Sequence, residues 1–459
     1  MKVKNITRRL TLIILIAISL VFTWIIWFNP SQLEHRATTN VSVKSTTETK
    51  ANKRKDAVFL PAAVYREQNG VKTLLVSDDR SMSGNVHTAL KTARVAHVNQ
   101  EKKLSSDAYD ALLTRDATVQ MVYTDKMSWR LFNGLFFNKV AKKTGREFEF
   151  TRILIDLRHE TISLLNDSKR TVRQLTFSTQ PKYAAVTRAL KKATDHFTIQ
   201  ETRMHGREVA LYTQSVSVQP YSYLVDQQGT NHYISALMGN SEKSTSSVDA
   251  KQVGTQTFYT VNNNNQRLTT DKDDNKMVFG NFATGKPKQT RRGVLTDAYT
   301  QMMTLAPTTL EGVRYASYDE TERTVTFRTY VGGLAVFDDT MNGTVSVTRT
   351  SSSLSMTFSS ENLSVPVPTR ESKVTLPATA TALANVRNHG FTNGEITDIQ
   401  LGYRWEKDDD STLVIDLVPT YYVALEGTYY DYSDILNGKV TEETIHPSTS
   451  KSGSQLNSN

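Results

Sequence analysis

The chain of 459 residues contains no cysteine, and this absence excludes several kinds of chemistry. Without a thiol there is no disulfide, no cysteine-ligated zinc or iron–sulfur cluster, and no thiol nucleophile. Stability must therefore come from ordinary hydrophobic cores, for which a hydrophobic content of 38% is sufficient. Glycine and proline are also scarce, at 21 and 11 residues, so most of the chain is not low-complexity sequence.

Recognisable catalytic and ligand-binding motifs are missing as well. The segment Gly280–Lys286 matches the first seven positions of a phosphate-binding loop, but Pro287 stands where a serine or threonine should hold magnesium. Residues 271–275 have the carboxylate spacing of a calcium loop, yet Lys276 replaces its glycine, which favours a solvated hairpin tip. The sequence therefore predicts a protein that is not an enzyme and has no metal or cofactor, although paired carboxylates cannot be recognised from sequence.

A long uncharged segment, Leu10–Phe28, is the strongest positive signal. As a helix its nineteen residues would span about 28 Å, close to the thickness of the hydrocarbon core of a bilayer. Its only polar members are three hydroxyl side chains, so it lacks the polar face of a soluble helix. The sequence predicts a single transmembrane helix over residues 10–28 in the cell membrane.

The distribution of charge gives the orientation of this helix. The formal net charge is +9, and the nine residues before the apolar segment hold four cations and no acid: Lys2, Lys4, Arg8 and Arg9. The positive-inside rule places this end in the cytoplasm and the bulk of the chain in an extracytoplasmic position. The charge left for the exterior is too dilute to indicate a nucleic-acid partner.

A cleaved signal peptide is the alternative interpretation of the apolar segment. Such a peptide has an apolar region of about 7–15 residues followed by small residues at the cut site. Here the run is longer and ends in aromatic residues, including Trp24 and Trp27. Tryptophan is enriched at membrane–water interfaces, so these two residues are candidate interfacial anchors, and a retained signal anchor is favoured.

Ser19 and Thr23 are four residues apart and share one face of the expected membrane helix. Hydroxylated residues can hydrogen-bond across to a second membrane helix, which makes this pair a candidate helix–helix interface. The alternative is that both hydroxyls bond back to the backbone of their own helix, as single hydroxyls in membrane helices often do.

The remainder of the chain predicts an α+β fold of mixed, mainly antiparallel sheets with flanking helices, because strand-like and helix-like patterns follow one another irregularly. The expected segments are a cytoplasmic N-terminus (1–9), the transmembrane helix (10–28), a stalk (29–56), an N-terminal α+β domain (57–145), a central α+β domain (146–287), a C-terminal α+β domain (288–440) and a disordered tail (441–459).

Individual elements are expected from hydrophobic periodicity. Predicted strands cover residues 58–65, 71–76, 118–123, 148–156, 161–165, 171–177, 197–202, 221–225, 258–261, 313–318, 324–330, 395–405 and 412–417. Predicted helices cover residues 85–98, 107–113, 128–140, 181–193, 294–305 and 376–389, and residues 239–251 are expected to form a polar loop.

The order and spacing of several short segments resemble the YycH (WalH) family. These segments are residues 19–27, 150–155, 325–337, the dipeptide Leu376-Pro377, residues 396–403, and Val418-Pro419. Tyr421 departs from the family pattern, in which a tryptophan follows the proline; the departure leaves the expected fold unchanged.

The resemblance implies a membrane-anchored auxiliary regulator of a WalK-type sensor histidine kinase, in the WalK/WalR (YycG/YycF) two-component system that governs cell-wall metabolism. It implies contact with the kinase through the membrane helix, and with a YycI-like membrane protein through the exterior domains. The two alternatives are an extracytoplasmic enzyme that acts on the cell wall, which would need a cleft with paired carboxylates, and a passive envelope scaffold.

Overall fold

The structure is a computed structural model that describes residues 55–77, 81–137, 146–239, 248–261, 265–271, 275–282, 284–305, 312–368, 371–408 and 411–446. The expected membrane helix at 10–28 lies outside these residues. Within them, no helix is both long and apolar enough to cross a membrane. Backbone contacts separate Met1–Asn52 from Lys53–Asn459, and the description below concerns the second unit alone.

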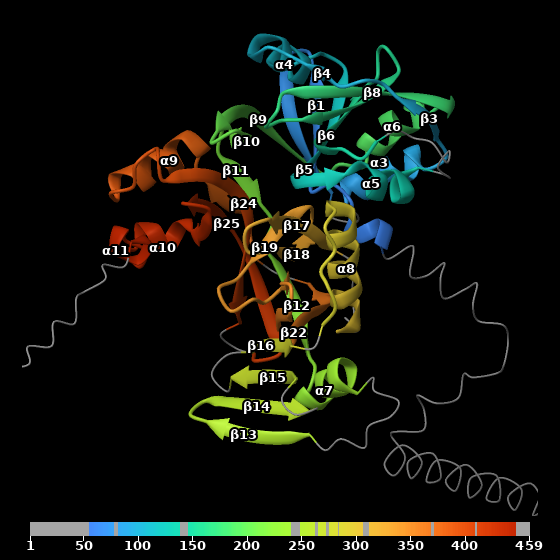
Figure 1. Cartoon of the computed structure of the whole chain (residues 1–459). Coiled ribbons are helices and arrows are strands. Elements are labelled where there is room, and N and C mark those ends of the chain that lie inside the picture. The colour runs from blue at the N-terminus through green and yellow to red at the C-terminus, as the bar shows by residue number, and fades with distance from the viewer. Residues whose placement is uncertain are drawn as a thin grey trace, which may run out of the picture. The chain divides into compact units, whose positions relative to one another are not determined.

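The first ten strands form one antiparallel sheet, here called the N-terminal lobe together with helices α3 to α6 (Figure 1). Its strand order is β10-β9-β2-β1-β5-β6-β7-β8-β3, and β4 pairs with β8. The strands are β1 (Ala63–Gln68), β2 (Val71–Val76), β3 (Arg94–Val98), β4 (Lys102–Lys103), β5 (Thr118–Ser128), β6 (Glu149–Asp156), β7 (Thr161–Asn166), β8 (Thr171–Thr179), β9 (Asp195–Met204) and β10 (Arg207–Tyr212).

Both faces of this sheet carry helices: α3 (Met82–Leu90), α4 (Ser106–Leu113), α5 (Trp129–Phe136) and α6 (Tyr183–Leu190). Three of them begin at a serine whose hydroxyl accepts a hydrogen bond from the first turn, which satisfies an otherwise unpaired N–H: Ser81, Ser105 and Ser128. Helices α3 and α6 pack against each other, and α4 buries Tyr109 and Leu112 with Leu154 and Leu165 of the sheet.

Two expectations for the N-terminal lobe are wrong. The strand expected over 58–65 begins only at Ala63, because residues 55–58 form a helical turn. The helix expected over 85–98 ends at Leu90, and Arg94–Val98 is the edge strand β3, paired with β8. The helical spacing behind this expectation runs through Val86, Leu90, Ala93 and His97. In β3 the buried residues are instead Val95 and Val98, while His97 is exposed.

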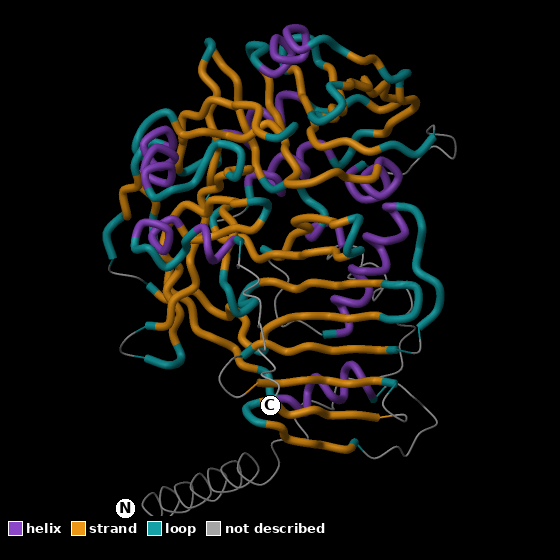
Figure 2. The backbone as a smooth tube through the Cα atoms, turned by 60° about the vertical axis from the view of Figure 1, so that its left-hand side comes forward, coloured by secondary structure: helices purple, strands orange, loops and turns teal. Residues whose placement is uncertain are grey.

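The later strands form the C-terminal lobe, which contains a mixed sheet and a two-stranded ribbon of β11 with β23. The mixed sheet has the order β13-β14-β15-β16-β21-β20-β18-β19-β24-β25-β12-β22, with β17 on β18 and β26 on β25. Only β19 and β24 pair in parallel among its described strands. Figure 2 shows part of this sheet as a ladder of strands lying side by side.

The strands of the C-terminal lobe are β11 (Val216–Val218), β12 (Tyr221–Gln227), β13 (Asp249–Val253), β14 (Gln256–Val261), β15 (Gln266–Asp271), β16 (Lys276–Asn281), β17 (Val313–Asp319), β18 (Thr324–Val331), β19 (Leu334–Phe337), β20 (Thr344–Arg349), β21 (Leu354–Ser359), β22 (Glu361–Val367), β23 (Val374–Leu376), β24 (Ile396–Lys407), β25 (Val414–Leu425) and β26 (Thr428–Asp431). Its helices are α7 (Thr230–Met238), α8 (Arg291–Thr304), α9 (Thr379–Asn388), α10 (Tyr432–Leu436) and α11 (Glu442–Ile445).

Two further expectations need correction in this lobe. The polar loop expected over 239–251 gives way at Asp249 to strand β13, which pairs with β14, while residues 240–247 lie outside the described residues. The tail expected from Thr441 starts with the short helix α11, where Thr441 and Thr444 form a reciprocal capping box.

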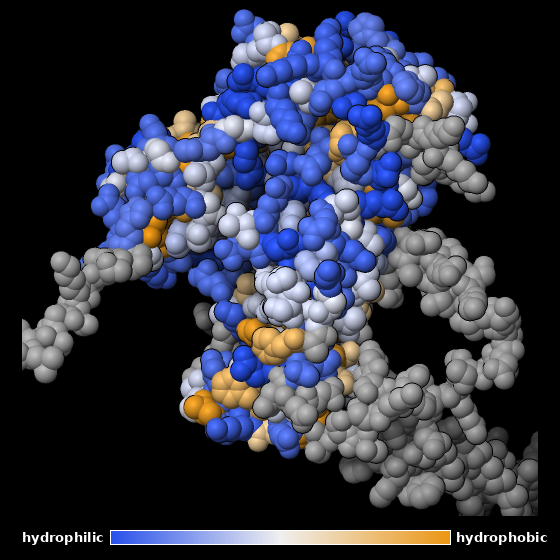
Figure 3. All heavy atoms as spheres, in the orientation of Figure 1, coloured by the Kyte–Doolittle hydropathy of each residue, from blue (hydrophilic) through white to orange (hydrophobic). Residues whose placement is uncertain are grey.

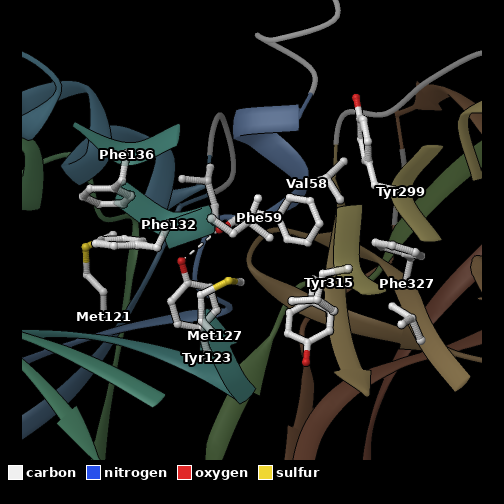
Figure 4. Close-up of a cluster of buried hydrophobic side chains, with 14 of the residues drawn as sticks. Val58, Phe59, Met121, Tyr123, Met127, Phe132, Phe136, Tyr299, Tyr315 and Phe327 are labelled. Atoms are coloured by element: carbon white, nitrogen blue, oxygen red, sulfur yellow. Dashed lines mark hydrogen bonds between the residues drawn. The ribbon is translucent and has the colours of Figure 1, made fainter. Parts of the chain in front are cut away.

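A single hydrophobic cluster runs from the N-terminal lobe into the C-terminal lobe (Figure 4). Phe59 lies near its centre, with ring centroids 6.0 Å from Tyr299 of α8, 6.1 Å from Tyr315 of β17 and 6.3 Å from Phe327 of β18. The hydroxyl of Tyr123 donates a 2.9 Å hydrogen bond to the carbonyl of Phe59. The two lobes therefore share a core.

The α+β class with mainly antiparallel sheets and flanking helices is confirmed. The division into three exterior domains stays a prediction. Hydrogen-bonded strands join segments on either side of both expected boundaries, since β5 pairs with β6 across residue 145 and β16 pairs with β21 across residue 287.

Candidate functional site

A cavity with a volume of about 640 Å³ lies where the two lobes meet. Its walls come from α3, the C-terminal end of α8, the β17–β18 hairpin and the start of β22. Apolar side chains of the shared core line one side: Leu60, Met302, Phe327 and Phe358. This volume is within the range of about 300–1,000 Å³ typical of small-molecule sites.

Glu361, the first residue of β22, supplies a buried carboxylate to the cavity wall. Strand β21 ends at Ser359 and β22 begins two residues later, so the chain bends here and turns the side chain inward. Glu361 is 8% exposed, and no described group hydrogen-bonds to its Oε2 atom. Burial raises the pKa of Glu361, and the weaker effects of the Lys407 charge and of a hydrogen bond with the Asn275 side chain oppose this shift.

Arg314 supplies a buried cation to the same cavity. Its side chain is 5% exposed, donates a 3.1 Å hydrogen bond to the carbonyl of Ala57, and lies over the ring of Tyr330. Burial lowers the pKa of this guanidinium to about 10. No carboxylate of the described residues forms an ion pair with it, so within this part of the chain a poorly solvated positive charge has no counter-charge.

A second arginine stands directly opposite Arg314 in the hairpin. The β17–β18 register pairs Arg314 with Arg328, so both side chains project from the same face of the sheet. Arg328 stacks on the ring of Phe337 at 3.9 Å, and burial lowers its pKa. Like charges placed opposite each other on adjacent strands repel, so this part of the structure favours an anion.

Arg291 at the start of α8 joins the lobes through polar contacts. Its Nε donates to Glu149 Oε1 at 2.9 Å and its Nη1 reaches Asp125 Oδ2 at 3.4 Å, and both acceptors belong to the N-terminal lobe. Within the C-terminal lobe, Nη2 pairs with Glu320 and Nη1 contacts the hydroxyl of Tyr315. Because this one side chain also donates to the carbonyl of Lys126 and so contacts both lobes, it fixes α8 against β5 and β6.

A buried charge network inside the N-terminal lobe is structural. Arg152 of β6 is fully buried and pairs with Glu201 at 2.6 Å and with Asp167 at 3.2 Å. Its Nη1 also donates to Gln120, and Lys72 forms an ion pair with Glu201. Since the charges of this network are balanced and it is enclosed beneath α4, it has no unpaired charge that could bind a ligand.

Exposed apolar side chains occur on or beside three neighbouring strands of the C-terminal lobe. Leu224 of β12 is 40% exposed, Val365 of β22 is 56% exposed, and Leu413 beside β25 is 67% exposed. The strands are adjacent, and the amide of Val225 donates to the carbonyl of Leu413 at 2.9 Å. We call Leu224, Val365 and Leu413 the apolar rim. Figure 3 shows that the face turned to the viewer is mostly hydrophilic, with many of its hydrophobic residues in the lower part.

The residues singled out in the sequence fall outside the described residues: Ser19, Thr23, Trp24 and Trp27. The sequence patterns did not indicate that Arg314 and Glu361 line a cavity. In a strand whose polar and apolar residues alternate, an arginine is expected to face solvent. Within the described ranges, no group of three or more His, Asp or Glu side chains is placed to hold a metal ion.

Two family descriptions match the chain. "YycH protein, N-terminal domain" matches residues 5–195, and "YycH protein, C-terminal domain" matches residues 207–434. The first match includes the apolar segment 10–28. No curated protein matches the chain.

A solved structure shares the fold of this chain. The crystal structure of YycH from Bacillus subtilis is similar, with a TM-score of 0.65 at 13% sequence identity, over 82% of this chain and 96% of that one. An uncharacterised protein from Eubacterium rectale shares 9% identity over 51% of this chain and 88% of its own, and its TM-score of 0.30 is too low to support an argument.

Proposed function

This chain belongs to the YycH protein family, and on that premise we propose that it is a membrane-anchored regulator of a WalK-type sensor histidine kinase that controls cell-wall metabolism. The observation that supports the proposal most strongly is the extent of the match, since two family descriptions cover nearly the whole chain in the expected order. In this proposal the protein carries out no catalysis itself.

The proposed contact with the kinase is made by the apolar segment 10–28 acting as a transmembrane helix. Ser19 and Thr23 form the face that meets a kinase helix, while Trp24 and Trp27 set the depth of the helix in the bilayer. A kinase with two signalling states changes its output only when the regulator binds one state more tightly. Moving the kinase from mostly one state to mostly the other takes about 5 kcal/mol of differential affinity.

The proposed exterior partner is a YycI-like membrane protein. The apolar rim supports this proposal, because three large apolar side chains on adjacent strands are costly to leave in water and are typical of a surface that a partner covers. The shared core and the Arg291 contacts support a second point, that binding at one lobe affects the other lobe.

The test is co-purification of the full-length chain with the kinase from membranes in mild detergent. The double variant Ser19→Leu/Thr23→Leu should reduce recovery of the kinase at least tenfold, whereas Thr11→Leu, two turns nearer the N-terminus, should leave recovery unchanged. Leu413→Glu should reduce recovery of the YycI-like protein and spare the kinase.

Unchanged recovery of the kinase with the double variant would reject the membrane-helix contact. Recovery of neither protein with the unaltered chain, together with unchanged expression of cell-wall genes when the chain is deleted, would reject the regulatory function as a whole.

A further inference from the structure

We propose that the cavity between the lobes binds a small zwitterion of the short-peptide type, with its ammonium group at Glu361 and its carboxylate at Arg314. This goes beyond the proposed regulation, because binding can be measured on the chain without any kinase. The argument rests on two opposite charges that line one cavity and form no ion pair with described residues.

The acidic end of the cavity points to a cationic hydrogen-bond donor. A buried carboxylate oxygen normally has a hydrogen-bond partner, and an orphan one costs free energy. Oε2 of Glu361 has none among the described residues, although the amide of Glu361 is satisfied by Ser359 Oγ at 3.0 Å. The backbone is therefore well fixed and only the carboxylate oxygen awaits a donor. An ammonium group would supply both the hydrogen bond and the counter-charge.

The basic end of the cavity points to a carboxylate. Arg314 has one hydrogen bond, to the carbonyl of Ala57, and lies beside Arg328 without an ion pair in the described residues. Five N–H groups in a planar fork match the two oxygens of a carboxylate. Glu361 does not fill this role, since no ion pair joins it to Arg314 among the described groups.

The walls between the two ends suit a short backbone with small side chains. Leu60, Met302 and Phe327 give the cavity apolar surface, and Asn85 and Thr329 give it polar groups. An extended peptide presents the same alternation, with amide groups that need partners and side chains that do not. The ligand would also touch both lobes at once, because α3 belongs to one and β22 to the other.

The experiment measures thermal unfolding of the full-length chain in detergent against dialanine, trialanine and tetra-alanine with free termini. We expect a saturable rise in the unfolding temperature for at least one length. Acetylating the amino end of that peptide, or amidating its carboxyl end, should weaken binding at least tenfold, because each change removes one charge.

Matched variants identify the contacts. Glu361→Gln keeps the shape of the side chain and should bind free and acetylated peptides equally, while Arg314→Gln should bind free and amidated peptides equally. If Arg314→Gln fails to fold, the amidated peptide on the unaltered chain tests the same contact. No saturable shift with any of the three lengths would overturn the proposal. Equal affinity of the unaltered chain for free and blocked peptides would also overturn it.

Discussion

Buried charges differ in how they are compensated in the two lobes. In the N-terminal lobe, burial alone would lower the pKa of Arg152, but Asp167 and Glu201 raise it well above its ordinary value. In the C-terminal lobe, burial lowers the pKa of Arg314 and no carboxylate of the described residues opposes the shift. The first arrangement holds a fold together, whereas the second leaves a charge available to a ligand.

Replacing Arg152 should show how much its buried ion-pair network matters for stability once the cation is lost. Arg152→Met leaves Asp167 and Glu201 buried with one cation fewer, and should lower the free energy of unfolding by about 3–5 kcal/mol. Urea unfolding of the full-length chain in detergent would measure it. Arg158→Met, at the exposed pair with Asp116, is the control and should have little effect. Equal effects of the two variants would contradict the assignment.

His87 should make stability depend on pH. It is buried in α3, its ring stacks on Phe136 at 4.4 Å, and burial lowers its pKa from the ordinary 6.5 to about 4. The folded chain therefore keeps His87 neutral where the unfolded chain would protonate it. Stability is complete above pH 6.5 and falls by roughly 3 kcal/mol as the pH drops from 6.5 toward 4.

The variant His87→Gln isolates this contribution, because glutamine can still donate to the carbonyl of Phe136 but does not titrate in this range. Unfolding free energies at a series of pH values should fall less steeply for the variant than for the unaltered chain. Parallel pH profiles would show that His87 is solvated in the folded state.

At the scale of single elements, hydrophobic periodicity predicted the observed strands best where neighbouring strands are joined by short turns. The strands expected at 161–165 and 171–177 match β7 and β8, because turn residues mark their ends and alternation fixes their inner faces. The helix expected over 85–98 failed in its second half, since pairing of β3 with β8 outweighs a local helical spacing of apolar residues.

Gly402 is required where β19 and β24 run in parallel. A Cβ at this position would lie 2.7 Å from the carbonyl oxygen of Ala335 and 2.9 Å from the ring of Phe337. Gly402→Ala should therefore lower the free energy of unfolding by about 1–3 kcal/mol. Gly134→Ala in α5, where a Cβ meets nothing within 4 Å, should raise it by about 0.5–1 kcal/mol. Urea unfolding measures the change in the free energy of unfolding for both variants. Changes of the same sign would refute the packing argument.

At the scale of the whole molecule, the shared core predicts that a destabilising substitution in one lobe also destabilises the other lobe. Phe59→Ala removes the ring between Tyr299, Tyr315 and Phe327 and should cost about 3–5 kcal/mol. Hydrogen exchange should show lost protection in β6 and in β18 together. Leu112→Ala, in the small cluster under α4, is the control and should affect β6 far more than β18.

The sequence predicted the fold class and the family, but not the cavity. Arg314 and Glu361 are far apart in the chain and line one cavity only through the long-range order of the mixed sheet. In that sheet several strands separate β22 from β18, the partner of the Arg314 strand β17. Local periodicity carries no information about such pairings. The expected interface at Ser19 and Thr23 stays a prediction.

The position of β10 has a practical consequence for dividing the gene. The second family match begins at residue 207, yet Arg207–Tyr212 pairs with β9 at the edge of the first sheet, and β9 in turn covers β2. A fragment that stops at residue 195 would leave the backbone of Lys72–Val76 bare and prone to pair with other copies. The first sheet is complete only in a chain that continues to Tyr212, and a break beyond that residue still divides the core that the two lobes share.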